Sequence, residues 1–169
     1  EAYSLHVPDD VEKRKQSLDL LDEVGKTVRA ARGDVLVGDG SFTRVDAPGL
    51  LMVRGDVLRR FHRLEDAQNA LSMVGNLLPR GQTRWQGNLL VAEAQLSWAE
   101  GDVTSCSEVA LDALTVMRET KSASNRAKIV ELYRDMYVKD PIHSGVRELG
   151  QRLQVDQPVR KVNKNAAIS

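Results

Sequence analysis

Residues 48–79 read PGLLMVRGDVLRRFHRLEDAQNALSMVGNLLP, and residues 87–118 read GNLLVAEAQLSWAEGDVTSCSEVALDALTVMR. The two segments align at an offset of 39 residues, which pairs Leu51 with Leu90, Gly55 with Ala94, and Ala67 with Cys106. Repetition at a fixed spacing of this size is typical of proteins built from stacked copies of one structural unit.

Each segment predicts two helices, because apolar residues recur at every third or fourth position. The predicted ranges are 48–62 and 64–78 in the first segment, and 85–100 and 102–118 in the second. Small residues stand where paired helices must approach closely, with Gly55 or Ala94 expected to face Ala67 or Cys106. One helix pair cannot bury its own apolar stripe, so we expect neighbouring pairs to stack.

The flanking segments extend the helical pattern in both directions. A leading helix is expected over 9–32 and terminal helices over 123–153, of which the last covers 143–153. The glycine-rich stretch 33–47 predicts a loop, and residues 157–169 predict a loose polar tail. We therefore expect an all-α domain over residues 1–156 that contains the repeats 48–79 and 87–118.

The composition limits the classes of function. The chain has 169 residues, 24 basic and 24 acidic side chains, and 41% hydrophobic residues. A net charge of zero gives no field that would attract nucleic acid, so we expect no direct nucleic-acid binding. No apolar run approaches the length needed to cross a bilayer, so we expect no membrane insertion. A single cysteine and the absence of a signal peptide favour the cytoplasm.

The paired segments resemble the tetratricopeptide repeat. That family places large apolar, small and apolar residues on a first helix, small residues on a second, and a closing proline. The residues Leu51, Gly55, Leu58, Ala67, Leu71 and Pro79 match in order, as do Leu90, Ala94, Gly101, Asp102, Cys106 and Ala113. The departures are Val74, Ser97 and Arg118, and a 39-residue spacing in place of 34, which implies a longer connection near 80–84. The resemblance implies antiparallel helix hairpins stacked as a right-handed α-solenoid.

Residues 85–153 are also similar to the C-terminal repeat region of bacterial helix-turn-helix transcriptional regulators. This resemblance implies a sensor or dimerisation domain that binds a protein or peptide, with a second copy of the chain as a further candidate partner. No helix-turn-helix is visible, and the missing initiator Met suggests a fragment of a longer chain. The alternatives are a free-standing repeat adaptor and an accessory domain of a signalling enzyme.

The family pattern also implies a binding groove on the first helix of each pair. The implied positions are Met52, Asp56, Arg59, Arg60, Asn88, Val91, Gln95 and Trp98. Further candidates on the helix expected to begin at residue 123 are Arg126, Glu131 and Arg134. Arginine offers forked donors, Asn and Gln pair with peptide amides, and Trp offers a flat anchor. The alternative is that the arginines form a solvated face and Trp98 belongs to the core. The Lys and Asn clamp that some family members use for a peptide carboxylate is not predicted here.

No pattern of catalytic, cofactor-binding or metal-binding residues is recognisable. Cys106 is expected to be a buried packing residue, although a nucleophile near a base was the alternative. The histidines His6, His62 and His143 are far apart, and no zinc-ligand spacing is present. The Gly-Asp-Gly-Ser sequence at 38–41 lacks the spacing of a phosphate-binding loop. We therefore expect a non-catalytic protein without cofactor or metal.

Overall fold

The computed structural model describes residues 11–30, 47–79 and 81–154. Every element in these ranges is an α-helix, which confirms the all-α prediction. The helices are α1 (Val11–Ala30), α2 (Ala47–Arg60), α3 (Leu64–Leu77), α4 (Thr83–Glu100), α5 (Val103–Thr120), α6 (Ala123–Lys139) and α7 (Ser144–Leu153). Each expected helix is therefore present. The predicted loop over 33–47 lies outside the described residues except for Ala47, which is the first residue of α2, and the predicted tail over 157–169 lies outside them entirely.

Local sequence signals set the helix ends. Gly101 adopts the left-handed conformation that ends α4, with φ of 84°, and its N–H donates to the carbonyls of Ser97 and Trp98. Asp102 then caps α5, because its side chain accepts a hydrogen bond of 2.9 Å from Ser105 N. Ser122 caps α6 in the same way. Two-residue connections thus join α4 to α5 and α5 to α6, whereas 78–82 form a longer connection between α3 and α4.

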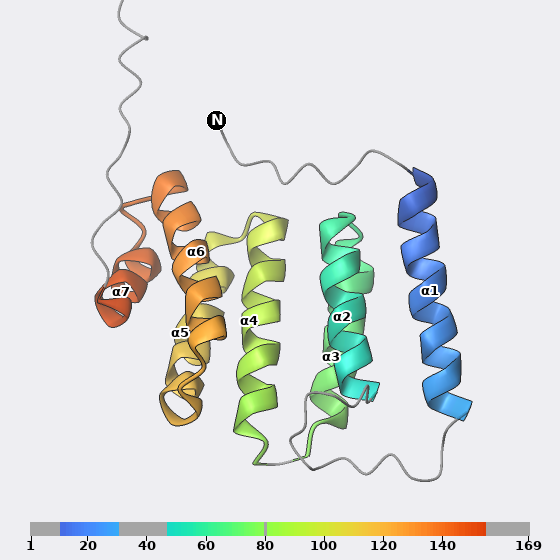
Figure 1. Cartoon of the computed structure of the whole chain (residues 1–169). Helices are drawn as coiled ribbons and strands as arrows, with labels where there is room; N and C mark the ends of the chain where they lie inside the picture. The colour runs from blue at the N-terminus through green and yellow to red at the C-terminus, as the bar shows by residue number, and fades with distance from the viewer. Residues whose placement is uncertain (1–10, 31–46, 80, 155–169) are drawn as a thin grey trace, which may run out of the picture.

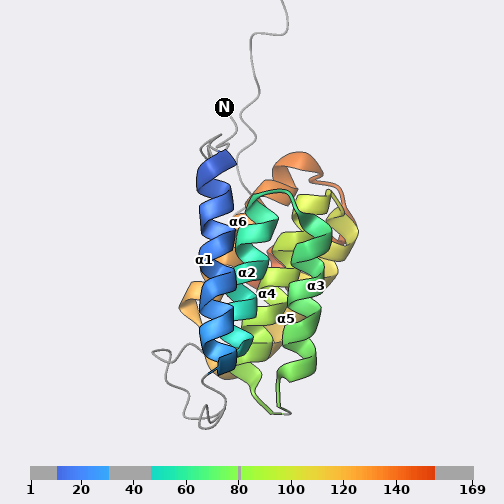
Figure 2. The same cartoon turned by 90° about the vertical axis from the view of Figure 1, so that its right-hand side faces the viewer.

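The helices form one row (Figure 1), with α1 at one end and α7 at the other. In Figure 1, α2, α4 and α6 lie on the near side, and α3 and α5 lie behind them. Figure 2 shows the same division from the end that α1 occupies. Contacts join each near-side helix to the next, α2 to α4 and α4 to α6, and also join α3 to α4 and α5 to α7. In the described part of the chain, α1 contacts α2 and no other helix.

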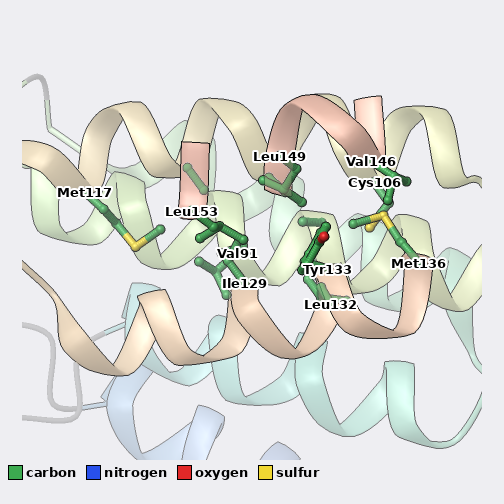
Figure 3. Close-up of a cluster of buried hydrophobic side chains, with 13 residues drawn as sticks. Val91, Cys106, Met117, Ile129, Leu132, Tyr133, Met136, Val146, Leu149 and Leu153 are labelled. Carbon is green, nitrogen blue, oxygen red and sulfur yellow. The ribbon is translucent and has the colours of Figure 1, made fainter. Parts of the chain in front are cut away.

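Buried apolar side chains form two clusters. The first joins α2 and α3 to one side of α4, through Leu58, Leu71, Val74, Leu89 and Leu96. The second joins the other side of α4 to α5, α6 and α7 (Figure 3). Its largest fully buried members include Tyr133, Ile129, Met136, Leu149 and Leu153. Helix α4 thus connects both clusters, and the two repeats share a continuous interior.

The predicted close approach at Gly55 is confirmed. A Cβ atom at this position would lie 2.8 Å from Leu71 Cδ2 and 3.7 Å from the carbonyl oxygen of Ala67. Ala94 and Cys106, which match Gly55 and Ala67 39 residues later, are both fully buried in the second cluster. A side chain at position 55 would therefore require Leu71 to move away from α2.

The 39-residue offset continues into a third helix pair, formed by α6 and α7, which was not predicted from the sequence. Ile129 of α6 matches Leu90, and Gly145 and Leu149 of α7 match Cys106 and Ala110. Ile129 and Leu149 are buried, and a Cβ at Gly145 would collide with Ser107 Oγ. The pair formed by α6 and α7 therefore repeats the packing positions of the two earlier pairs.

Candidate binding face

The predicted site residues lie on the helices that share the near side in Figure 1. Met52, Asp56, Arg59 and Arg60 belong to α2, and Asn88, Gln95 and Trp98 belong to α4. Because α4 contacts both α2 and α6, these residues and Arg134 of α6 are carried by three adjacent helices. We call this set of eight residues the α2–α4–α6 face.

On α2, one carboxylate holds two guanidinium groups. Arg59 Nη2 donates to Asp56 Oδ1 at 2.6 Å, and Arg60 Nε donates to Asp56 Oδ2 at 2.9 Å. The Arg59 side chain is 20% exposed and the Arg60 side chain 55%. The three residues together carry one positive charge, and each guanidinium has further N–H groups that can donate to a ligand.

On α4, Trp98 is partly buried, which agrees in part with the core position that was the alternative for it, and its role as an anchor for a ligand stays a prediction. Its ring packs against the second cluster, while the ammonium of Lys139 lies 5.1 Å from the ring centroid. Lys139 also donates to the carbonyl of Gly101 at 3.3 Å. The lysine therefore fixes one side of the indole and adds a positive charge beside it.

Gln95 and Arg134 have side chains without an internal partner. Gln95 is partly exposed on α4, and Arg134 is exposed on α6. Within the described ranges neither side chain makes a hydrogen bond or an ion pair. Their donor and acceptor groups are consequently satisfied by water and can be transferred to a ligand at little cost.

Two predicted positions require correction. Val91 is 1% exposed and belongs to the second cluster, because α6 covers this side of α4. It therefore lies in the core and does not belong to the face. Asn88 is partly buried, and its Oδ1 accepts a hydrogen bond of 2.7 Å from Asn125 Nδ2. Its amide group joins α4 to α6, which leaves less of it available to a ligand.

The candidates on α6 also take different roles. Arg126 Nη2 donates to the carbonyl oxygen of Leu153 at 2.6 Å and so satisfies the end of α7. Glu131 is exposed, and its charge adds to burial in raising the pKa of Asp135, with burial the larger cause. Of the three, only Arg134 is assigned to the face.

Among the described residues, Cys106 and His143 were the side chains with the clearest reactive chemistry, and the structure shows the surroundings of both. Cys106 is fully buried, and burial, followed by the charge of Asp102, raises the pKa of its thiol to about 12. A thiol with this pKa is not a nucleophile at neutral pH, so the packing role expected for Cys106 is confirmed. His143 lies at the start of α7, where its Nε2 is 3.1 Å from Thr104 Oγ1.

The described residues include neither a membrane-spanning helix nor a metal-binding cluster. None of the helices is long and apolar enough to cross a membrane. No three His, Cys, Asp or Glu side chains in the described ranges are grouped so that they could hold a metal ion.

Comparison with known proteins identifies no relative. No protein-family model, no curated protein and no solved structure matches this chain. The contacts and charges of its own residues are therefore the basis for any statement about function.

Proposed function

We propose that this chain is a non-catalytic helical-repeat domain that binds a protein or peptide segment on its α2–α4–α6 face. The observation that supports the proposal is the contact of α4 with both α2 and α6, because the helices that carry Arg59, Gln95 and Arg134 are then neighbours. The face combines free amide and guanidinium groups with the partly exposed ring of Trp98. Extended peptides are bound by such combinations, because every peptide unit offers a donor and an acceptor.

The fold proposed for this function is a right-handed solenoid of antiparallel hairpins. Three helix pairs repeat with the same packing positions at 39-residue steps. The connections within the pairs are 61–63, 101–102 and 140–143. In stacked repeats of this kind, each unit contacts its neighbours and the first helices line a continuous surface.

The resemblance of residues 85–153 to bacterial transcriptional regulators supplies a context for this binding. In that context the domain would sense a peptide or protein and pass the signal to a DNA-binding domain elsewhere in the regulator. A free-standing adaptor would bind through the same face without such a domain. DNA binding by the natural gene product, measured with and without bound peptide, distinguishes the two roles.

The binding proposal is tested by selecting ligands from a random peptide library displayed on phage. The selected peptides are measured by fluorescence polarisation against Gln95→Ala/Arg134→Ala. The matched control is Gln68→Ala/Arg118→Ala, which changes the same residue types on α3 and α5. We expect the first variant to bind about tenfold or more weakly, because two ligand contacts are lost, and the control to bind like wild type.

Two results would contradict the proposal. One is a library that yields no peptide enriched above an unrelated helical protein. The other is a set of peptides whose affinity falls only in the α3–α5 control. Circular dichroism on both variants shows whether a loss of binding comes from unfolding.

A further inference from the structure

Charge is divided unequally between the first and the second helices of the three pairs, although the chain as a whole is neutral. The first helices, α2, α4 and α6, carry eight basic and five acidic side chains, which gives a net charge of +3. The second helices, α3, α5 and α7, carry three basic and six acidic side chains, which gives a net charge of −3. The α2–α4–α6 face therefore belongs to the positive part of the array, and α3 and α5, which lie behind it in Figure 1, belong to the negative part.

Within the α2–α4–α6 face, the positive charges exceed the negative ones. The charged members of the face are Asp56, Arg59, Arg60 and Arg134. Asp56 already accepts hydrogen bonds from both arginines of α2. Arg134 is exposed and makes no ion pair with Glu131, the exposed acid three residues before it. The face thus has a net charge of +2, and its own carboxylate is already bound to two guanidinium groups.

Helix α4 supplies an uncharged strip between these basic groups. Four partly exposed residues recur at steps of four, three and four along one side of this helix: Asn88, Ala92, Gln95 and Ala99. The positions on either side of the strip are covered, Val91 by the second cluster and Leu96 by the first. The strip is therefore the open part of α4. Its two alanines leave room for a peptide backbone, which Gln95 can bind through its amide group.

We propose that the segment bound on the α2–α4–α6 face is an acidic peptide, whose backbone lies on the uncharged strip and whose carboxylates pair with Arg60 and Arg134. This inference rests on the proposed function, because it names the ligand chemistry of the same face. A guanidinium group donates two parallel hydrogen bonds to a carboxylate, and opposite charges also speed the encounter of the two molecules. The negative charge of the second helices repels the same ligand and so directs it to the first helices.

The spacing of the helices sets the length of the bound segment. Neighbouring packed helices are about 10 Å apart, so the helices that carry Arg60 and Arg134 are about 20 Å apart. An extended segment of about six residues spans this distance, at about 3.3 Å per residue. The ligand therefore has two acidic residues about five or six positions apart. A nucleic acid fits less well, because its phosphates are continuous whereas the uncharged strip separates the basic groups of the face.

The test uses peptides selected on the wild-type chain from a random phage library. We expect the selected peptides to be richer in Asp and Glu than the unselected library. Each acidic peptide is compared by fluorescence polarisation with a counterpart in which Asn replaces Asp and Gln replaces Glu. The counterpart should bind at least about tenfold more weakly, and only the binding of the acidic peptide should weaken as salt is added.

The protein variants remove two arginines either from the first helices or from the second helices. Arg60→Gln/Arg134→Gln should bind acidic peptides about tenfold more weakly and their uncharged counterparts as wild type does. The control is Arg118→Gln/Arg152→Gln, which should leave both affinities unchanged. Arg60 and Arg152 match because each pairs with an acid four residues earlier on its own helix. Arg134 and Arg118 match because both are exposed. The polar outer side of α7, on which the last control position lies, consists of Ser144, Arg147, Glu148, Gln151 and Arg152.

The outcomes separate this inference from the proposed function. Selected peptides that are no richer in acid than the library would overturn the inference alone, provided that Gln95→Ala/Arg134→Ala still weakens their binding. A library that yields no peptide contradicts both. An equal loss of affinity in the two glutamine variants would also overturn the inference. So would a single-stranded DNA oligonucleotide that displaces the acidic peptides at a lower concentration than they need to bind.

Discussion

Gly150 of α7 lies directly against the ring of Tyr133 on α6. A Cβ atom at position 150 would be 2.7 Å from Tyr133 Oη and 2.8 Å from Cε2 and Cζ. In the two earlier repeats the small residue stands on the first helix, at Gly55 or Ala94. In the third repeat the matching position is Tyr133, and Gly150, five residues after Gly145 of the partner helix, provides the space.

Gly150→Ala should therefore destabilise the protein by about 1–3 kcal/mol, because the added methyl group overpacks a rigid ring. The control is Gly75→Ala, where the nearest atom would be at an ordinary distance of 3.7 Å. There we expect a gain of about 0.5–1 kcal/mol, as alanine is the better helix former. Urea denaturation of the three proteins measures both effects. Equal stability changes at the two sites would show that the contact with Tyr133 is not a constraint.

Glu93 should stabilise the folded protein more at low pH than at neutral pH. The side chain is partly buried on α4, and burial raises its pKa above the ordinary value of 4.5. A raised pKa in the folded state means that the stabilising contribution is full below about pH 4.5 and is lost as the pH rises through the folded-state pKa. Glu93→Gln should therefore be more stable than wild type at pH 7 and equal to it at low pH.

Thermal unfolding across a pH series checks this expectation. Glu108→Gln, an exposed acid on α5, serves as the control and should follow wild type throughout. A Glu93→Gln variant that loses stability at pH 7 would mean that the carboxylate makes a favourable contact instead.

The amide pair of Asn88 and Asn125 should stabilise the packing of α6 on α4. Asn125 is 5% exposed, and its Nδ2 donates to Asn88 Oδ1 at 2.7 Å. Asn88→Ala leaves the buried amide of Asn125 unpaired and should cost about 1–3 kcal/mol, and Asn125→Ala should cost less because Asn88 is only partly buried. The double variant should cost less than the sum, which denaturant unfolding of the full mutant cycle measures. Additive losses would indicate that the two amides do not depend on each other.

Cys106 should resist thiol reagents in the folded protein. Its side chain is fully buried, and the pKa of its thiol is raised to about 12. Labelling with an aromatic disulfide at pH 8 should therefore proceed only as fast as the chain opens, and should become fast in denaturant. Rapid labelling of the native protein would place the thiol at the surface and contradict its position between α4 and α5.

Helix positions were predictable because their signals are local. The turn Gly101-Asp102 carries both a left-handed residue and a capping side chain, and the structure uses each in that role. The contact at Gly55 was predictable as well, since two antiparallel helices approach each other closely only where a side chain is small. These features depend on a few neighbouring residues, so one sequence suffices to identify them.

The third repeat and the burial of residues on the α2–α4–α6 face depend on contacts between residues that are far apart in the sequence. Tyr133 occupies a position that is small in the other copies, so the compensating Gly150 is recognisable only after α6 and α7 are paired in space. The family pattern implied a groove position for Val91 on α4, yet α6 packs over it. Helical periodicity shows which side of a helix is apolar, but it does not show how closely the next helix approaches.

The polar outer side of α7 also affects how this architecture can be extended. A designed 39-residue unit appended after Leu153 would meet Arg147, Gln151 and their neighbours, and would first need those residues replaced. Extending the array after α7 therefore depends first on the chemistry of its outer side.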